Sequence, residues 1–240
     1  MEKLLKLFFF VMVVSQTFAQ EQPNANQIID KYVTAIGGKP AIDAIKDITL
    51  AYTSESPRGV AETEIKYLFP NKFAMGIYAN GNAIMNTTCD GVKLKRFSMW
   101  GGGGDQAPKE GPEVQFEALR ANPFAEVSYT NNNIKAELQG TEKVGDKDAY
   151  KVQLSNAEGK TWFDYFDVDS GLKVKTFSSM ETPRGKMENT VLYEDYKKFK
   201  GVDVLFPAVT KRTTQMGEIS SELQSVKINK NLSDKDFIVK

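Results

Sequence analysis

The stretch at residues 72–99, KFAMGIYANGNAIMNTTCDGVKLKRFSM, decides the fold class. Its residues fall into three short runs, which are separated by Asn80-Gly81 and by Asp90-Gly91. Asn-Gly and Asp-Gly favour the tight turns of β-hairpins, because they tolerate the positive φ angles that such turns require. The stretch therefore predicts three consecutive antiparallel strands, at residues 72–80, 82–89 and 92–99.

Residues 48–69, which precede this stretch, also show the alternation of side chains that is typical of strands. Apolar and small polar residues alternate over residues 48–53. In residues 60–69, Ile65, Tyr67 and Phe69 fall on one face, opposite a face that carries Glu62, Glu64 and Lys66. A period of two is typical of a half-buried strand. Five strands joined by short turns predict an antiparallel meander.

Strands resume in the second half of the chain, where turn residues such as Ser170-Gly171 and Arg184-Gly185 separate the runs. These runs predict seven strands, at residues 134–144, 149–155, 160–168, 172–181, 186–196, 205–216 and 218–230. The predicted total is about a dozen strands.

Helices are predicted at two places. Asn26 is a suitable N-cap for a helix over residues 27–36, Gly37-Gly38 ends it, and a second short helix runs from Pro40 to about Lys46. A further helix is predicted over residues 113–121, with Val114, Phe116 and Leu119 as its apolar positions. It follows the loop that opens with WGGGGD at residues 100–105, which is either a hinge for this helix or a plain flexible loop.

The order of elements predicts a mainly β protein, namely a strongly curved antiparallel half-barrel of about a dozen strands with covering helices. An open sheet of this size usually curls, because a flat one exposes a large apolar face. The predicted helices are too few to fill the concavity, so we expect a cavity. A fully packed barrel or sandwich core is the alternative.

The first 19 residues have the features of a secretory signal. Lys3 and Lys6 form a short positive region, residues 4–14 are a nearly unbroken apolar run, and Thr17-Phe18-Ala19 provides small residues for cleavage. The run is shorter than the about 20 residues that cross a bilayer, which disfavours the alternative of an uncleaved anchor. We expect residues 1–19 to be removed and residues 20–240 to form a single exported domain.

Composition argues against several function classes. Without residues 1–19 the chain has 29 basic and 30 acidic residues, so the basic excess of nucleic-acid binders is absent. Cys89 is the only cysteine and the chain has no histidine, which removes His-based nucleophile pairs and His-bound zinc sites. We expect no enzyme, and a hydrolase that uses paired carboxylates, such as Glu62 with Glu64 or Asp164 with Asp167, is the less favoured alternative.

No cofactor or metal is expected. Asp167, Asp169 and Gly171 are similar to the start of a calcium loop, but position twelve is Ser178 rather than Glu, and a tight turn explains these residues. Cys89 beside Asp90-Gly91 is expected to be a small buried residue at a strand end rather than a reactive thiol.

Four segments resemble the LolA/LolB superfamily of outer-membrane lipoprotein-sorting proteins, especially the versions common in Bacteroidetes. The first is AIGGK at residues 35–39, followed by AIDAIKD at residues 41–47. The other three are YFDVDSGL at residues 165–172, Phe206-Pro207, and Ile228-Asn229 with LSDKDF at residues 232–237. These segments are spread over nearly the whole mature chain in the family's order.

The resemblance implies an incomplete antiparallel barrel, lidded by helices, whose apolar cavity takes acyl chains. It implies a soluble periplasmic carrier or binder of lipoprotein acyl chains or other lipids. The alternative is a lipid-sensing regulatory or structural module of the envelope. In the family's carrier an Arg on an early strand holds the lid closed; the nearest candidate here, Arg58, lies in a predicted turn, which departs from that pattern.

The expected partners are acyl chains of lipoproteins or other lipids and envelope transfer proteins, with peripheral or transient membrane contact and no nucleic acid. Methionine and aromatic residues are frequent in the predicted strands, and flexible thioethers suit surfaces that accept varied apolar ligands. The predicted ligand-binding residues are Met75, Ile77, Phe116, Leu119, Phe163, Tyr165, Leu172, Val174, Met187 and Val191.

Overall fold

The computed structural model describes residues 22–99, 104–182, 185–214 and 217–240. The predicted signal peptide, and most of the four-glycine run that was considered as a hinge, lie outside the described residues. No helix within the described ranges is long and apolar enough to cross a membrane.

Two helices come first, α1 (Ala25–Ala35) and α2 (Lys39–Asp43). The N-cap of α1 is Asn24 rather than the predicted Asn26. The Asn24 side chain accepts a hydrogen bond from the Gln27 backbone N–H at 3.0 Å, and the Gln27 side chain accepts one from the Asn24 N–H at 2.9 Å. This capping box satisfies two backbone donors at once, which a cap at Asn26 would leave without partners.

The remaining chain is mostly strands. The first strands are β1 (Asp47–Ser56), β2 (Gly59–Leu68), β3 (Lys72–Ala79), β4 (Asn82–Cys89), β5 (Lys93–Ser98), β6 (Gly104–Asp105) and β7 (Lys109–Glu110). They are followed by α3 (Pro112–Ala121) and the 3-10 turns η1 (Ala125–Ser128) and η2 (Thr130–Asn132). The last elements are β8 (Lys135–Val144), β9 (Lys147–Ser155), β10 (Thr161–Asp167), β11 (Lys173–Thr182), β12 (Gly185–Lys198), β13 (Leu205–Thr214), β14 (Gly217–Ile228) and η3 (Asp234–Phe237).

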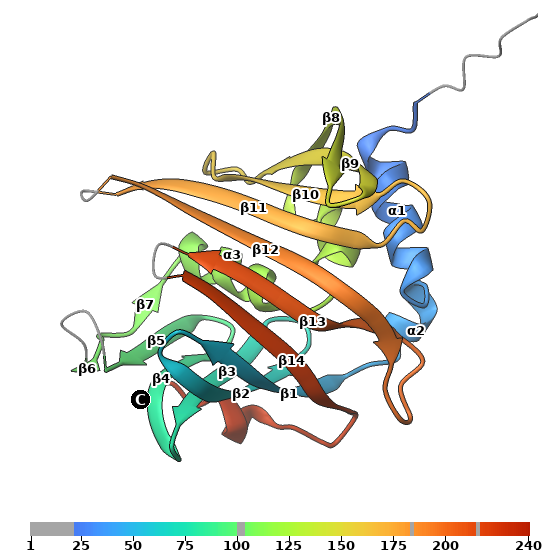
Figure 1. Cartoon of the computed structure of the whole chain (residues 1–240). Helices are drawn as coiled ribbons and strands as arrows, with labels where there is room; N and C mark the ends of the chain where they lie inside the picture. The colour runs from blue at the N-terminus through green and yellow to red at the C-terminus, as the bar shows by residue number, and fades with distance from the viewer. Residues whose placement is uncertain (1–21, 100–103, 183–184, 215–216) are drawn as a thin grey trace, which may run out of the picture.

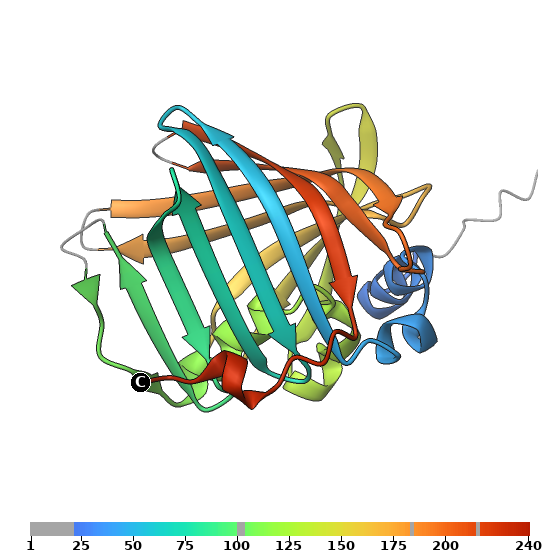
Figure 2. The same ribbon diagram turned by 90° about the horizontal axis from the view of Figure 1, so that it is seen from below.

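The strands form one antiparallel sheet in the order β6-β5-β4-β3-β2-β1-β14-β13-β12-β11-β10-β9-β8, with β7 paired to β5. The pairing of β1 with β14 joins the first meander to the second. The sheet curves strongly, α1 and α2 stand at one end of it, and α3 lies inside the curve (Figures 1 and 2). The predicted mainly β half-barrel with covering helices is confirmed, and the strands beyond the predicted dozen are the two-residue β6 and β7.

The two faces of the sheet differ as the alternation predicts. Ile48 on β1 pairs with Tyr67 on β2, and both are almost completely buried in the main core on the concave side. Glu62, Glu64 and Lys66 alternate with these core positions and therefore lie on the convex side. Cys89, at the end of β4, is fully buried as predicted, and burial raises the pKa of its thiol.

Asp167 forms the turn between β10 and β11. Its Oδ1 accepts hydrogen bonds from the backbone N–H and the hydroxyl of Ser170, both at 2.6 Å, and Gly171 follows with a φ of 73°. An Asp side chain that accepts hydrogen bonds from residues further along the chain stabilises a tight turn. This turn accounts for Asp167, Ser170 and Gly171 in the sequence.

This turn predicts a pH effect. Burial alone raises the pKa of Asp167, but the bonds from Ser170 and the charge of Lys147 outweigh it and hold the pKa below its usual value. The stabilisation is therefore present above the unfolded pKa of about 3.9 and is lost as the pH falls through the folded pKa. In urea unfolding at several pH values, Asp167→Asn should be less stable than the parent at pH 7 and should approach it in acid. Parallel pH curves would contradict this assignment.

Candidate functional site

The helices cover only part of the concave face. The strand register defines an open half of this face, whose residues are half-buried rather than buried. Its larger apolar members are Met75, Ile77, Met85, Val191 and Ile219, and its small members are Ser54, Ala61, Thr63, Thr210 and Ser221. Because the small side chains do not fill the space between the larger apolar ones, this half of the concave face keeps apolar surface in contact with solvent.

Helix α3 crosses the concave side and is tied to the first meander. Arg96 on β5 forms an ion pair with Glu117 at 2.5 Å. The Gln115 side chain donates to the Gly91 carbonyl at 2.8 Å, and the Tyr67 hydroxyl donates to the Ala118 carbonyl at 3.2 Å. These contacts join the helix to β2, β5 and the β4–β5 turn.

The opposite side of α3 contacts β10. The ring of Phe116 lies 5.5 Å from that of Trp162, and the Arg120 guanidinium lies over the same indole at 4.9 Å. The indole N–H of Trp162 is buried and has no hydrogen-bond partner among the described residues. The helix predicted at residues 113–121 is confirmed, with Val114 and Leu119 buried. It bridges the two halves of the curved sheet.

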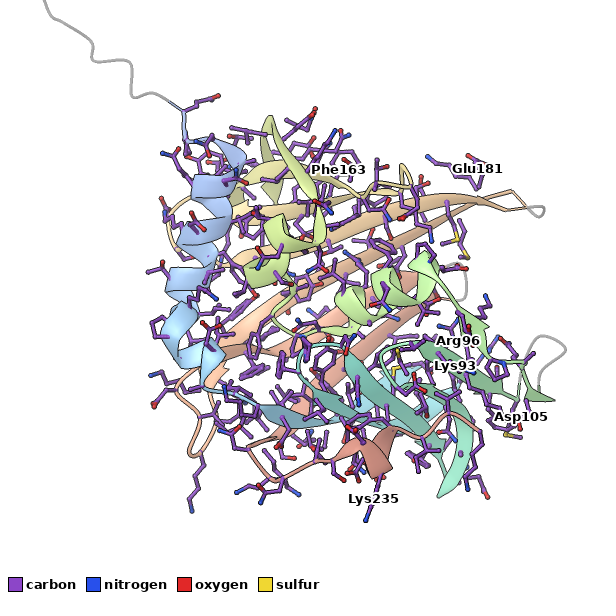
Figure 3. The ribbon with its side chains drawn as sticks, turned by 180° about the vertical axis from the view of Figure 1, so that it is seen from behind. Lys93, Arg96, Asp105, Phe163, Glu181 and Lys235 are labelled. Carbon is purple, nitrogen blue, oxygen red and sulfur yellow. The ribbon has the colours of Figure 1, made fainter. Side chains whose placement is uncertain are left out.

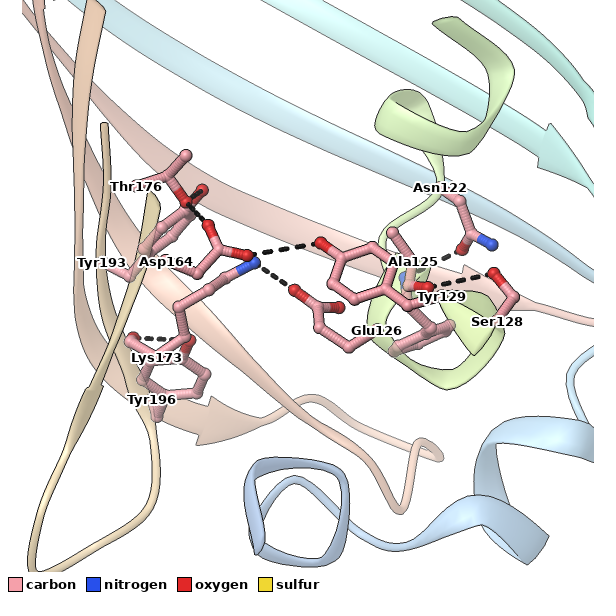
Figure 4. Close-up of polar contacts among 11 residues, drawn as sticks. Asn122, Ala125, Glu126, Ser128, Tyr129, Asp164, Lys173, Thr176, Tyr193 and Tyr196 are labelled. Atoms are coloured by element: carbon pink, nitrogen blue, oxygen red, sulfur yellow. Dashed lines mark hydrogen bonds and ion pairs between the residues drawn. The ribbon is translucent and has the colours of Figure 1, made fainter. Parts of the chain in front are cut away.

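A buried polar network lies at the closed end of the concave face (Figure 4). Its centre is Lys173 on β11, whose ammonium forms an ion pair with Glu126 on η1. The Glu126 side chain is 2% exposed and that of Lys173 is 14% exposed. Two charges at this depth must be paired, because neither is hydrated by bulk water.

Hydrogen bonds extend the network across three strands. Asp164 on β10 accepts from the Thr176 hydroxyl at 2.6 Å and from the Tyr129 hydroxyl at 3.3 Å. Thr176 in turn accepts from the Tyr193 hydroxyl on β12 at 3.1 Å. The segment η1–η2 is thus attached directly to β10 and β11 by polar bonds, and β12 joins the network through Thr176.

The electrostatics keep these groups in fixed protonation states. Burial alone lowers the pKa of Lys173, but the Glu126 carboxylate, with Tyr193 and Asp164, outweighs it and holds the pKa well above the usual value. Burial, and then the charges of Asp164 and Glu126, raise the pKa of Tyr129. The ammonium therefore stays charged and the phenol stays neutral at physiological pH, and in these states each donates a hydrogen bond to a carboxylate.

Sequence reasoning missed this network. Lys173 is turned inward by a β-bulge opposite Tyr165 and Phe166, because Lys173 pairs with Phe166 and Lys175 with Tyr165. Glu126 lies between the predicted third helix and the next strand, where no element is predicted. The sequence does contain a signal for buried acidic groups. Glu126 lies in the mainly apolar run FAEVSY, and Asp164 lies in the mainly apolar run WFDYF.

The ten predicted ligand-binding residues do not share one surface. Met75, Ile77 and Val191 lie on the open half of the concave face, as their strand registers show. Phe116 and Leu119 are on α3, and Leu172 packs beside the main core. For these six residues the binding role stays a prediction.

The other four predicted residues lie elsewhere. Phe163 (labelled in Figure 3), Tyr165 and Val174 belong to a separate cluster with Ala149 on the convex face. The Lys151 ammonium lies over the rings of Phe163 and Tyr165, and that of Lys175 lies over the Tyr165 ring. Phe163 and Tyr165 alternate along β10 with Trp162, Asp164 and Phe166, which face inward, so this cluster does not line the same surface as α3. Met187 lies on the same face of β12 as Val191, but it is four residues nearer the outer end of the strand and 41% exposed.

Two pockets lie away from the open half. One of about 480 Å³ is formed by α1, the η1–η2 segment and the start of β8, and Glu126 and Tyr129 are part of its wall. Another of about 380 Å³ lies between β4, β5 and residues 238–240. Neither contains any of the ten predicted residues.

Comparison with known proteins gives likeness in structure alone. No family model matches the chain, and no curated protein matches it in sequence. A LolA superfamily protein from Nitrosomonas europaea is 15% identical over 91% of this chain and 99% of its own, with a TM-score of 0.58. A DUF1329 family protein from Desulfovibrio piger is 12% identical over 90% of this chain and 98% of its own, with a TM-score of 0.56.

A third solved structure is a domain from Vibrio parahaemolyticus assigned to outer membrane lipoprotein sorting. It is 11% identical over 89% of this chain and 95% of its own, with a TM-score of 0.51. Each match extends over at least 89% of this chain. The likeness to the LolA/LolB superfamily that the sequence predicts is therefore confirmed at the level of the fold.

Proposed function

We propose that this protein binds acyl chains, of lipids or of lipid-modified proteins, on the open half of its concave face, and carries them in the bacterial envelope. The observation that carries the proposal is the set of apolar side chains on that half, which includes Met75, Ile77 and Val191. These side chains are half-buried, and the helices among the described residues leave them partly uncovered. Exposed apolar surface inside a concavity is typical of a binding site for an apolar ligand.

The transfer free energies of an acyl chain are compatible with reversible binding and release. Burying one CH₂ gains about 0.8 kcal/mol, so a 16-carbon chain gains roughly 12 kcal/mol over water. A membrane offers about the same gain, so transfer between the membrane and the concave face is close to balance. Small differences in the seating of α3 then suffice to set the direction of transfer.

Export and fold support an envelope role. The predicted signal peptide at residues 1–19 supports export of the mature chain, and a structural neighbour is assigned to outer membrane lipoprotein sorting. Catalysis by paired carboxylates is less favoured. Glu62 and Glu64 lie on the convex face, and Asp164 is buried and accepts two hydrogen bonds within the network.

Blocking the open half should weaken binding. We expect Val191→Trp to lower the affinity for a fluorescent fatty acid by at least about tenfold, which corresponds to about 1.4 kcal/mol. The indole occupies space that the chain needs, and the half-buried position allows the larger side chain without the strain of a packed core. Titration with the probe measures the affinity, and thermal unfolding measures the stability of the same variant.

Leu192→Trp is the matched control, because Leu192 is the next residue and its side chain lies on the convex face, opposite Lys175 and Lys211. Its affinity should equal that of the parent. If Val191→Trp instead unfolds many degrees earlier, the open half is a packed core. A parent protein that binds neither fatty acid nor diacylated peptide would contradict the proposed function as a whole.

A further inference from the structure

We propose that the bound lipid is anionic and that Arg212 on β13 pairs with its carboxylate or phosphate group. This inference rests on the proposed function and adds the chemical class of the ligand. It follows from the position of Arg212, from the charges on the rest of the concave face, and from the length of the strand that carries the residue.

Arg212 lies on the concave face. Phe206 and Ala208 on the same strand are buried in that direction, and positions 210 and 212 follow them with a period of two. The register places Arg212 between Val191 on β12 and Ile219 on β14, both apolar members of the open half. The side chain itself is exposed.

Arg212 is an exposed ionic group of this face, and no acidic side chain among the described residues forms an ion pair with it. Arg96 pairs with Glu117, and Lys173 pairs with Glu126. The side chains next to Arg212 on its face are Val191, Ile219 and the threonines along β13, none of which is acidic. Its neighbour Lys211, on the convex face, pairs with Glu194 at 2.9 Å. An unpaired guanidinium among apolar side chains is suited to an anion that arrives joined to an apolar chain.

The length of β13 fits this arrangement. Arg212 is six positions after Phe206, which lies at the buried end, so at about 3.3 Å per residue the two are about 20 Å apart. An acyl chain in one leaflet spans about 15 Å, half of the 30 Å hydrocarbon core. A chain whose headgroup lies at Arg212 can therefore run along the open half towards the covered end. The planar guanidinium binds carboxylate or phosphate oxygens with two parallel hydrogen bonds.

The test compares palmitate and 1-palmitoyl lysophosphatidate with palmitic acid methyl ester, which has the same chain and no charge. We expect the parent to bind the two anionic lipids at least about tenfold more tightly than the ester. Arg212→Gln should reduce this preference to about threefold or less, with the ester bound as in the parent, and Arg212→Lys should retain part of it. Lys211→Gln is the matched control and should bind like the parent.

The outcomes separate the inference from the proposed function. Equal binding of all three lipids by the parent, or equal loss for all three in Arg212→Gln, overturns the role of Arg212 and leaves the acyl-chain site in place. Binding of inorganic phosphate alone that depends on Arg212 overturns the assignment of a lipid headgroup. Absence of binding for every lipid overturns both proposals.

Discussion

Replacement of Lys173 with Met is expected to lower the free energy of unfolding by about 3–5 kcal/mol, because it leaves Glu126 buried without its cation. The Glu126 side chain is 2% exposed and the pair joins η1 to β11, so relaxation towards water requires η1 to leave the sheet. Urea unfolding at pH 7 measures the loss directly. In a thermal scan the same loss corresponds to roughly 6–20 °C, at about 2–4 °C per kcal/mol for a domain of this size.

Lys175→Met provides the control. Lys175 is two residues away on the same strand and lies over the Tyr165 ring at 4.1 Å on the convex face, so its loss should cost under about 1 kcal/mol. The double variant Lys173→Met with Glu126→Leu should regain much of the stability, since replacing both partners of a buried pair with apolar residues is often neutral. A single variant within about 1 kcal/mol of the parent would show that the pair is not buried as described.

Replacement of Phe166 with Ala should also cost about 3–5 kcal/mol, the usual range for deleting a buried aromatic ring. Phe166 is completely buried on the concave side of β10, and its ring lies 5.5 Å from that of Tyr32 on α1. The deletion therefore leaves a cavity between the sheet and the first helix. Urea unfolding followed by far-UV circular dichroism gives the change in stability.

Phe163→Ala tests the assignment of the two faces. Phe163 is on the same strand, but it lies half-buried on the convex face with the Lys151 ammonium 4.9 Å from its ring. Its deletion should cost only about 1–2 kcal/mol, because less area is returned to water. Equal losses for Phe163→Ala and Phe166→Ala would contradict the orientation of β10.

Much of the architecture is predictable because its signals are local. The hairpin of β3 and β4 follows from Asn80-Gly81, and both residues indeed have positive φ angles, of 50° and 77°. The helix at residues 113–121 and the turn at Asp167 follow in the same way from neighbouring residues. Backbone geometry at such positions depends on side chains only a few residues away, so it can be read without knowing the tertiary structure.

The orientation of the strands was harder to predict. A simple alternation backwards from Thr176 places Val174 inside and Lys173 outside. The bulge opposite Tyr165 reverses both, since Val174 packs on the convex face and Lys173 enters the core. A bulge adds one residue to one strand and so changes the face of every residue beyond it, and a period-two pattern alone does not show where this happens.

The sequence by itself determined the strand-rich meander, the positions of most turns and the three helices, because each depends on residues close together in the chain. Only the tertiary structure decided which side chains share a surface. Glu126 and Lys173 are 47 residues apart, and they meet because a bulge and the docking of η1 bring them together. Arg212 stands between Val191 and Ile219 because three strands pair in one register. Such contacts depend on the register of the whole sheet, so a local sequence pattern does not predict them.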